Sequence, residues 1–266
     1  MSFISEHINT INTKGEKVLS VFLTAGYPEK KIFTGLAADI IEAGADMLEI
    51  GIPFSDPLAD GPVIQSSSQN VISNGITMKE VFEFTSVIKS KRDIPLILMG
   101  YANPILRYGI MDFFQDAVSS GADGVIIPDV PYEEYDSFYC QGSDLDKILL
   151  VTPTSSEERI IKIDQLSTGF LYCVSVTGVT GVLKQFSEAT IESIKQAYSI
   201  IKKNKMLLGF GISNEESIEQ VKNYCDGVIV GSAVIKLLTE CGIKETLALV
   251  EKLKAATRNS FSVLNR

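Results

Sequence analysis

A carboxylate inside an apolar strand and a second one in the loop behind it are the residues best suited to proton-transfer chemistry. Glu49 lies within the apolar run Met47–Gly51, and Asp60 follows in a loop that carries several prolines. Apolar surroundings disfavour the charged form of a carboxyl group and raise its pKa, as a general acid or base requires. The loop is long enough for Asp60 to fold back toward the same ligand. A structural alternative is that Glu49 pairs with a polar group in the core.

The aspartates of this loop also have an ordinary explanation. Asp56 precedes Pro57 and Asp60 precedes Gly61. Aspartate commonly begins turns beside proline and glycine. We favour the turn interpretation for Asp56, whereas spacing alone leaves both interpretations open for Asp60.

Three glycine-rich segments late in the chain suggest a phosphate site. They are TGVTGV at 177–182, GFGIS at 209–213 and VGSAV at 230–234. Glycine lets a phosphate approach backbone N–H groups, and Ser232 would begin a short helix over Ala233–Leu238 whose N-terminus favours an anion. One such motif is usually a turn, but three in consecutive units favour phosphate binding. The segment around Thr180 is predicted either to close over a ligand or to be an ordinary mobile loop.

Apolar and aromatic residues at or beside the ends of apolar runs are candidates for the lining of a pocket. Each of them alone is more often part of a core. They are Phe22, Tyr101, Ile127, Tyr172 and Phe210.

Composition disfavours several other chemistries. The 266 residues contain one histidine, His7, and four cysteines without a C-x-x-C pair, so a catalytic Ser-His-Asp relay or a metal site is not expected. A net charge of -9 disfavours binding to nucleic acid or anionic membranes. Lys17, Lys147 and Lys205 precede predicted strands and none ends one, so no Schiff-base lysine is evident. The N-terminus lacks a secretory pattern, and we expect a cytoplasmic protein.

Eight short apolar runs alternate with amphipathic helical patterns, as in repeated βα units with a parallel sheet. The predicted strands are Val18–Thr24, Met47–Gly51, Pro95–Met99, Gly124–Ile127, Ile148–Val151, Phe170–Ser175, Met206–Gly209 and Gly227–Val230. Eight such units predict an α/β fold, a (β/α)₈ TIM barrel, rather than an open doubly wound sheet. An extra N-terminal helix near Ser5–Thr13 would cover the bottom of the barrel. Residues 1–266 are interpreted as a single barrel domain.

The motifs together resemble the alpha subunits of tryptophan synthase over nearly the whole chain. The stretch at 49–62 is the most specific of them. The matching segments are FLTAGYP at 22–28, EIGIPFSDPLADGP at 49–62, YANP at 101–104, PDVP at 128–131, GVTG at 178–181, GFGIS at 209–213 and GSA at 231–233.

This resemblance implies a lyase that cleaves indole-3-glycerol phosphate to indole and glyceraldehyde 3-phosphate by a retro-aldol reaction. It implies Glu49 as the general acid/base and Asp60 as the group that stabilises charge on the indole nitrogen. Tyr172 would shape the pocket and Thr180 would belong to a closing loop. The implied phosphate-binding residues are Gly181, Gly211, Gly231 and Ser232. The family has no cofactor in this subunit and pairs with a pyridoxal-phosphate beta subunit in an alpha2beta2 tetramer.

Three other functions remain open from the sequence. A stand-alone lyase would release free indole, a non-catalytic barrel would only bind or regulate, and another phosphate-binding barrel would share the late glycine loops. Retention of both Glu49 and Asp60 argues against the non-catalytic barrel. For a beta subunit we expect the contact surface to include the loop from Pro53 to Asp60 and the Asn103–Pro104 turn, because loops at the barrel mouth face outward.

Overall fold

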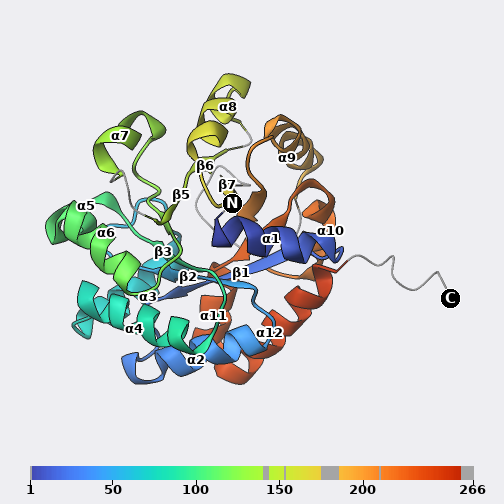
Figure 1. Cartoon of the computed structure of the whole chain (residues 1–266). Coiled ribbons are helices and arrows are strands. Elements are labelled where there is room, and N and C mark those ends of the chain that lie inside the picture. Colours follow the sequence, from blue (N-terminus) through green and yellow to red (C-terminus); the bar gives the residue numbers. More distant parts are fainter. Residues whose placement is uncertain (1, 140–143, 153, 175–185, 210, 259–266) are drawn as a thin grey trace.

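A ring of parallel strands surrounded by helices forms the molecule (Figure 1). The computed structural model describes residues 2–139, 144–152, 154–174, 186–209 and 211–258. The strands are β1 (Val18–Thr24), β2 (Met47–Gly51), β3 (Leu96–Met99), β4 (Gly124–Ile126), β5 (Asp146–Ile148), β6 (Leu150–Val151), β7 (Leu171–Val174), β8 (Met206–Gly209) and β9 (Gly227–Val230). Neighbouring strands in the sheet are all parallel.

The sheet closes on itself at an interrupted strand. Its order is β5-β4-β3-β2-β1-β9-β8-β7-β6, and only Leu149 separates its two end strands in the chain. The Leu149 N–H is donated to the Ser167 hydroxyl at 3.0 Å, which breaks the single strand that we predicted over Ile148–Val151. The strand also begins earlier than predicted, at Asp146, so Lys147 lies within β5 rather than before it. The predicted TIM barrel is confirmed, with its fifth strand in two pieces.

Helices follow most strands and surround the barrel. They are α1 (Phe3–Thr13), α2 (Lys30–Glu42), α3 (Pro62–Ser73), α4 (Met78–Lys91), α5 (Ala102–Tyr108), α6 (Ile110–Ser119), α7 (Tyr135–Phe138), α8 (Glu157–Leu166), α9 (Glu188–Ile200), α10 (Glu215–Val221), α11 (Ser232–Glu240) and α12 (Ile243–Ala256), with 3₁₀ turns at Tyr132–Glu134 and Lys222–Tyr224. Helix α3 was not predicted from the sequence. Its buried face includes Ser67 and Ser68, and these polar residues weaken the apolar periodicity that Ile64 and Val71 begin.

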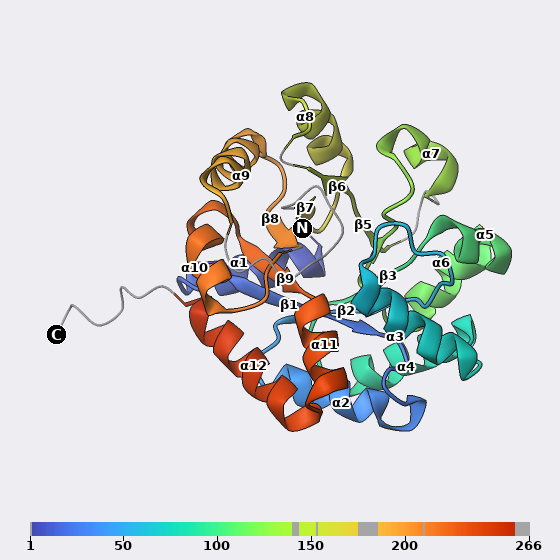
Figure 2. The same cartoon turned by 180° about the vertical axis from the view of Figure 1, so that it is seen from behind.

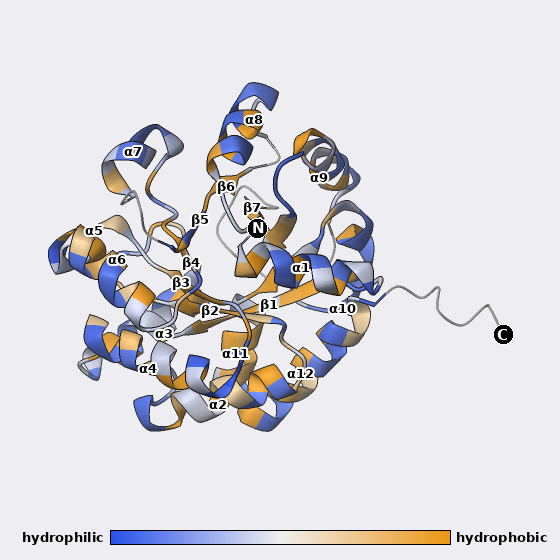
Figure 3. Ribbon diagram, in the orientation of Figure 1, coloured by the Kyte–Doolittle hydropathy of each residue, from blue (hydrophilic) through white to orange (hydrophobic). Residues whose placement is uncertain are grey.

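The core lies between the apolar strands and the inner faces of the helices (Figure 3). All seven residues of β1 are buried, as expected of a parallel strand that is covered on both faces. Helix α1 covers the N-terminal ends of the strands with Ile4, Ile8 and Ile11, in agreement with the extra helix expected there. Within the described residues, no helix has the length and apolar character needed to cross a membrane.

Three aspartates clamp neighbouring strands at the N-terminal end of the barrel. Each aspartate directly precedes its own strand. Its N–H donates to the backbone carbonyl of a residue on the adjacent strand, and its carboxylate accepts the N–H of that same residue. The pairs are Asp46 with Leu19, Asp123 with Leu96 and Asp226 with Met206, with N–H to carboxylate distances of 2.8, 2.8 and 2.9 Å. This reciprocal pairing fixes the register of β1 with β2, β3 with β4, and β8 with β9.

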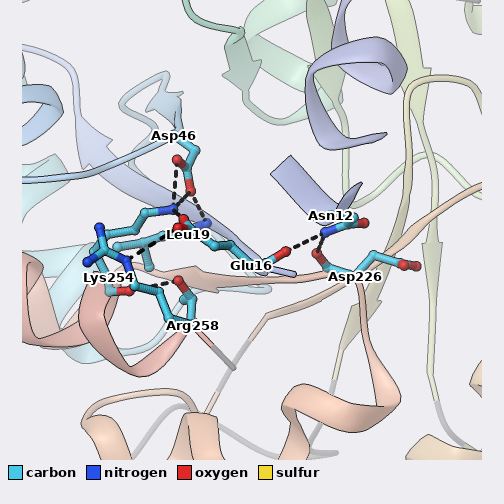
Figure 4. Close-up of polar contacts among 8 residues, drawn as sticks. Asn12, Glu16, Leu19, Asp46, Asp226, Lys254 and Arg258 are labelled. Atoms are coloured by element: carbon cyan, nitrogen blue, oxygen red, sulfur yellow. Dashed lines mark hydrogen bonds and ion pairs between the residues drawn. The ribbon is translucent and has the colours of Figure 1, made fainter. Parts of the chain in front are cut away.

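The first of these clamps is tied to both ends of the chain (Figure 4). Lys254 of α12 contacts both carboxylate oxygens of Asp46 at 3.0 Å and also lies 3.0 Å from the carboxylate of Glu16. Asn12 of α1 donates to the backbone carbonyls of Glu16 and Asp226 at 3.0 and 2.9 Å. The N-terminal helix and the last helix are therefore joined to the strands through one polar network.

Replacement of Asp46 by alanine should destabilise the fold by about 2–4 kcal/mol, because the Leu19 N–H and the Lys254 ammonium both lose a largely buried acceptor. Chemical denaturation at pH 7 measures this loss. Glu42→Ala is the matched control: Glu42 pairs with Arg92, but its side chain is 66% exposed, and its loss should change stability by less than about 1 kcal/mol. Equal effects of the two substitutions would contradict a stabilising role for the clamp.

Candidate active site

A cavity lies at the carboxyl ends of the strands, opposite α1 (Figure 2 views the barrel from this end). Active sites of such barrels occupy this end. Strands β1, β2, β3, β7 and β9, helices α3 and α11, and the loops after β2, β8 and β9 contribute to its wall. The lining residues are Phe22, Glu49, Asp60, Ile64, Met99, Tyr172, Gly211, Ile212, Ile229, Gly231 and Ser232.

Glu49 is fully buried in the middle of β2, paired in register with Phe22 of β1. Its Oε1 accepts a hydrogen bond from the Ser20 hydroxyl at 3.1 Å. Its Oε2 has no hydrogen-bond partner among the described residues. Burial raises the pKa of Glu49 to about 8, and the Ser20 hydrogen bond opposes this only in part. At neutral pH Glu49 is mostly a neutral acid that can donate a proton.

Asp60 lies at the end of a turn that begins at Pro57, whose carbonyl accepts the Asp60 N–H at 3.1 Å. The Gln65 side chain donates to the Asp60 carbonyl at 2.8 Å and ties this turn to α3. The residue is only 8% exposed, and burial raises its pKa to about 6, against the lowering effect of a hydrogen bond from Tyr101. Asp60 is therefore mostly ionised at neutral pH, unlike Glu49.

Tyr101 anchors the loop that carries Asp60. Its hydroxyl donates to the Asp60 carboxylate and accepts the Ala59 N–H at 3.2 Å. Its ring lies 5.5 Å from that of Phe54, between ring centroids. Tyr101, which we predicted in the pocket lining, is not among the lining residues of this cavity, and its hydroxyl contacts the loop that carries Asp60.

Two aromatic rings of the cavity wall lie against glycines on neighbouring strands. A Cβ on Gly51 would come within 2.3 Å of the Phe22 ring, and a Cβ on Gly209 within 2.1 Å of the Tyr172 hydroxyl oxygen. Any larger residue at either glycine would displace the ring from its place. These glycines therefore set how closely Phe22 and Tyr172 approach the sheet and how much space remains above Glu49.

Small residues after β8 and at the start of α11 form another part of the cavity wall. Gly231 precedes α11, Ser232 is its first residue, and Gly211 adopts a φ of +82° that favours glycine. The N-terminus of a helix carries unsatisfied N–H groups and a partial positive charge, so it favours a phosphate or carboxylate. The cavity thus joins an acidic, largely apolar interior to a side that suits an anion.

Comparison with known proteins assigns the family. A family model described as tryptophan synthase alpha chain matches residues 8–263. The chain belongs to the tryptophan synthase alpha chain family. Members of this family are lyases of tryptophan biosynthesis, and they pair with beta chains, to which the cofactor pyridoxal phosphate belongs.

Relatives and solved structures agree with this assignment. The tryptophan synthase alpha chain of Christiangramia forsetii is 43% identical over 256 residues, which cover 94% of this chain and all of the relative. That of Petrotoga mobilis is 44% identical over 232 residues, 85% of this chain and 88% of the relative. A crystal structure of the alpha chain from Legionella pneumophila matches with a TM-score of 0.89 at 34% identity, covering 98% and 99% of the two chains. A Mycobacterium tuberculosis tryptophan synthase structure matches with a TM-score of 0.89 at 30% identity, covering 97% and 99%.

Most of the residues that the sequence suggested for this alpha chain surround the same cavity. The structure brings together Phe22, Glu49, Asp60, Tyr172, Gly211, Gly231 and Ser232. Ile127 is buried beyond the end of β4 and is not among the lining residues. Thr180, Gly181 and Phe210 lie outside the described residues.

Sequence reasoning missed four apolar residues of the wall. They are Ile64, Met99, Ile212 and Ile229. Met99 ends β3, and this position was the one signal that could have identified it. The others look like ordinary core residues in sequence. Across the described ranges, no group of three or more histidine, cysteine, aspartate or glutamate side chains is arranged to hold a metal ion.

The burial of Glu49 should make the stability of this alpha chain depend on pH. Its pKa is about 8 in the fold against 4.5 for an exposed glutamate, so the folded state binds the extra proton between these values and loses stability as pH rises through them. Glu49→Gln removes this titration. The unfolding free energy of Glu49→Gln minus that of the natural chain should therefore increase as the pH rises toward 8, by up to about 1.4 kcal/mol per pH unit, and then level off.

Denaturant titrations at several values between pH 6 and pH 9 measure this difference. Glu42→Gln, at an exposed position, is the control and should show no such slope. A stability difference for Glu49→Gln that stays constant over this range would mean that Glu49 does not titrate there.

Proposed function

We propose that this chain cleaves indole-3-glycerol phosphate to indole and glyceraldehyde 3-phosphate by a retro-aldol reaction. The observation that carries the proposal is the pair of buried carboxyl groups, Glu49 and Asp60, which line one cavity and have pKa values near 8 and 6. Two carboxyl groups whose environments separate their pKa values provide an acid and an anion at the same pH. Membership of the alpha chain family supports the choice of substrate.

The two carboxyl groups account for every proton in this reaction. Neutral Glu49 donates its proton to C3 of the indole ring, and the positive charge that develops on the ring nitrogen is stabilised by ionised Asp60, which accepts the ring N–H. The bond between C3 and the glycerol carbon then breaks, and its electron pair returns to the ring. The glycerol hydroxyl becomes the aldehyde as its proton passes to the Glu49 carboxylate. Glu49 is thereby restored to its neutral form.

The remaining cavity residues match the two ends of this substrate. Phe22, Met99, Tyr172 and Ile229 offer apolar surface for an indole ring. At the other side, Gly211, Gly231 and Ser232, beside the start of α11, suit the phosphate, and we propose Gly181 as a further phosphate ligand from the family resemblance. Tyr101, Ile127 and Phe210, from their positions at or beside strand ends, and Thr180, from the family resemblance, stay predicted substrate contacts.

We further propose that the chain pairs with a beta subunit in an alpha2beta2 tetramer, to which it passes indole. The side chain of Leu58 supports this, because it is 92% exposed in the loop between Pro53 and Asp60. In a contact between the two chains, this side chain would be buried in the apolar core of the interface. Pairing there would couple the partner directly to the turn that holds Asp60. Activation by a partner is what separates this proposal from a stand-alone lyase.

We also propose that residues 1–266 form a single barrel domain and that the protein acts in the cytoplasm. Strand β1 pairs with β9, so the two ends of the chain share one sheet and neither half completes the barrel alone. Cys173 and Cys225 are buried free thiols, which a reducing compartment preserves.

Indole release from indole-3-glycerol phosphate by the purified chain, with and without a beta subunit, tests the reaction. We expect release that the beta subunit strongly increases. Glu49→Gln should lower turnover by at least about 10²-fold, because it removes the general acid while keeping the side-chain shape. Glu42→Gln should retain full activity. Near-normal turnover by Glu49→Gln refutes the mechanism, and vigorous activity without a partner favours the stand-alone lyase.

The pH dependence of kcat/KM should be bell-shaped in the natural chain. The rate should rise as Asp60 ionises near pH 6 and fall as Glu49 loses its proton near pH 8. The substrate phosphate also ionises at about pH 6. The Asp60→Asn variant distinguishes the ionisation of Asp60 from that of the phosphate, because any acid limb that remains in this variant comes from the phosphate. A profile without an alkaline limb would contradict the role of neutral Glu49.

A further inference from the structure

Ser20 is a buried polar residue beneath the proposed active site. It lies in β1, two residues before Phe22, so both side chains project from the same face of the strand toward the barrel interior. Its side chain is fully buried, and its hydroxyl donates to Oε1 of Glu49 at 3.1 Å. Glu49 and Phe22 line the cavity, whereas Ser20 is not among the lining residues. The hydroxyl therefore reaches the carboxyl group from within the barrel, off the path of a substrate.

We propose that Ser20 is a positioning residue that holds Oε1 of Glu49 and so reserves Oε2 as the oxygen that exchanges the proton with the substrate. This proposal rests on the proposed function and adds to it the choice of oxygen.

The hydrogen-bond chemistry of a neutral carboxyl group supports this choice. A neutral carboxyl group has one carbonyl oxygen that accepts and one hydroxyl oxygen that donates. When Ser20 keeps toward the neutral group the donor role that it has toward the carboxylate, Oε1 is the carbonyl oxygen and the acidic proton resides on Oε2. Oε2 has no other hydrogen-bond partner among the described residues, so no protein group in them competes for its proton.

The same hydrogen bond adjusts the strength of the acid. A hydrogen bond to an ionised oxygen is stronger than one to a neutral oxygen, so Ser20 favours the carboxylate and opposes the effect of burial on the pKa of Glu49. Without the hydroxyl, Glu49 would keep its proton more firmly and release it less readily to C3. It would also lack an anchor, since its carboxyl group has no second partner in the described part of the chain.

Substitutions at position 20 test the proposal through the pH profile of indole release. Ser20→Ala should lower kcat several-fold, leave KM nearly unchanged and move the alkaline limb upward by about half to one pH unit, because it removes a charge-assisted hydrogen bond. Ser20→Thr keeps a hydroxyl, and Ser20→Val has nearly the same shape without one. The threonine variant should therefore keep the natural profile and the valine variant should match alanine.

Ser120→Ala is the matched control, since the Ser120 hydroxyl is also buried but donates to the Ala117 carbonyl at 2.7 Å, away from the cavity. It should cost stability without moving the limb. A Ser20→Ala variant that loses activity equally at every pH, with no shift of the limb, would mean that Ser20 only supports packing and would overturn the proposal.

A readout without catalysis separates this proposal from the proposed function. Difference infrared spectroscopy follows the carboxyl C=O band of Glu49, identified by its loss in Glu49→Gln, as the pH is raised. The midpoint should move upward in Ser20→Ala and return in Ser20→Thr. An unmoved midpoint overturns the contact itself. A shifted midpoint in a chain that does not cleave the substrate overturns the proposed reaction, and the catalytic role of Ser20 with it.

Discussion

A carboxyl group enclosed at the centre of an apolar barrel is the constraint on which the rest of the site depends. Glu49 belongs to a strand with neighbours on both sides, so its backbone cannot move to bring the carboxyl group into water. Burial favours the neutral form, and the one hydrogen bond that Ser20 supplies is too little to reverse this. A neutral acid at neutral pH is therefore a consequence of where the residue stands in the sheet.

The clamps at the opposite end of the barrel make this placement precise. Asp46 and Glu49 are three residues apart in the chain, and the partner of Asp46 is Leu19, the neighbour of Ser20. The clamp thus fixes β1 against β2 at the level just below the contact between the Ser20 hydroxyl and the Glu49 carboxyl group. One slip of register would turn the side chains of a strand to its other face. The end of the barrel that holds the aspartate clamps and the end that holds the cavity are therefore joined through two short strands.

Sequence patterns predicted the features that depend on hydrophobic periodicity and on local residue type. The apolar runs located the strands, and an acidic residue inside one of them identified Glu49. The interruption at Leu149 was not predictable, because it depends on a serine eighteen residues later that reaches back to the strand. The contact between the Tyr101 hydroxyl and the Asp60 loop was not predictable either, because the sequence shows only an aromatic residue after a strand and the contact exists only in three dimensions.

The two carboxyl groups differ in protonation because they are buried in different ways. Glu49 is held by a rigid strand among apolar side chains and has a single hydroxyl donor, whereas Asp60 retains some exposure and receives the Tyr101 hydroxyl. One stretch of sequence supplies both groups, the strand providing the acid and the turn behind it the anion. Because Tyr101 contacts both the backbone at Ala59 and the carboxylate of Asp60, any movement of this turn also changes the environment that sets the charge of Asp60. A partner that contacts the turn at Leu58 would therefore act on the anion while leaving the acid in its strand undisturbed.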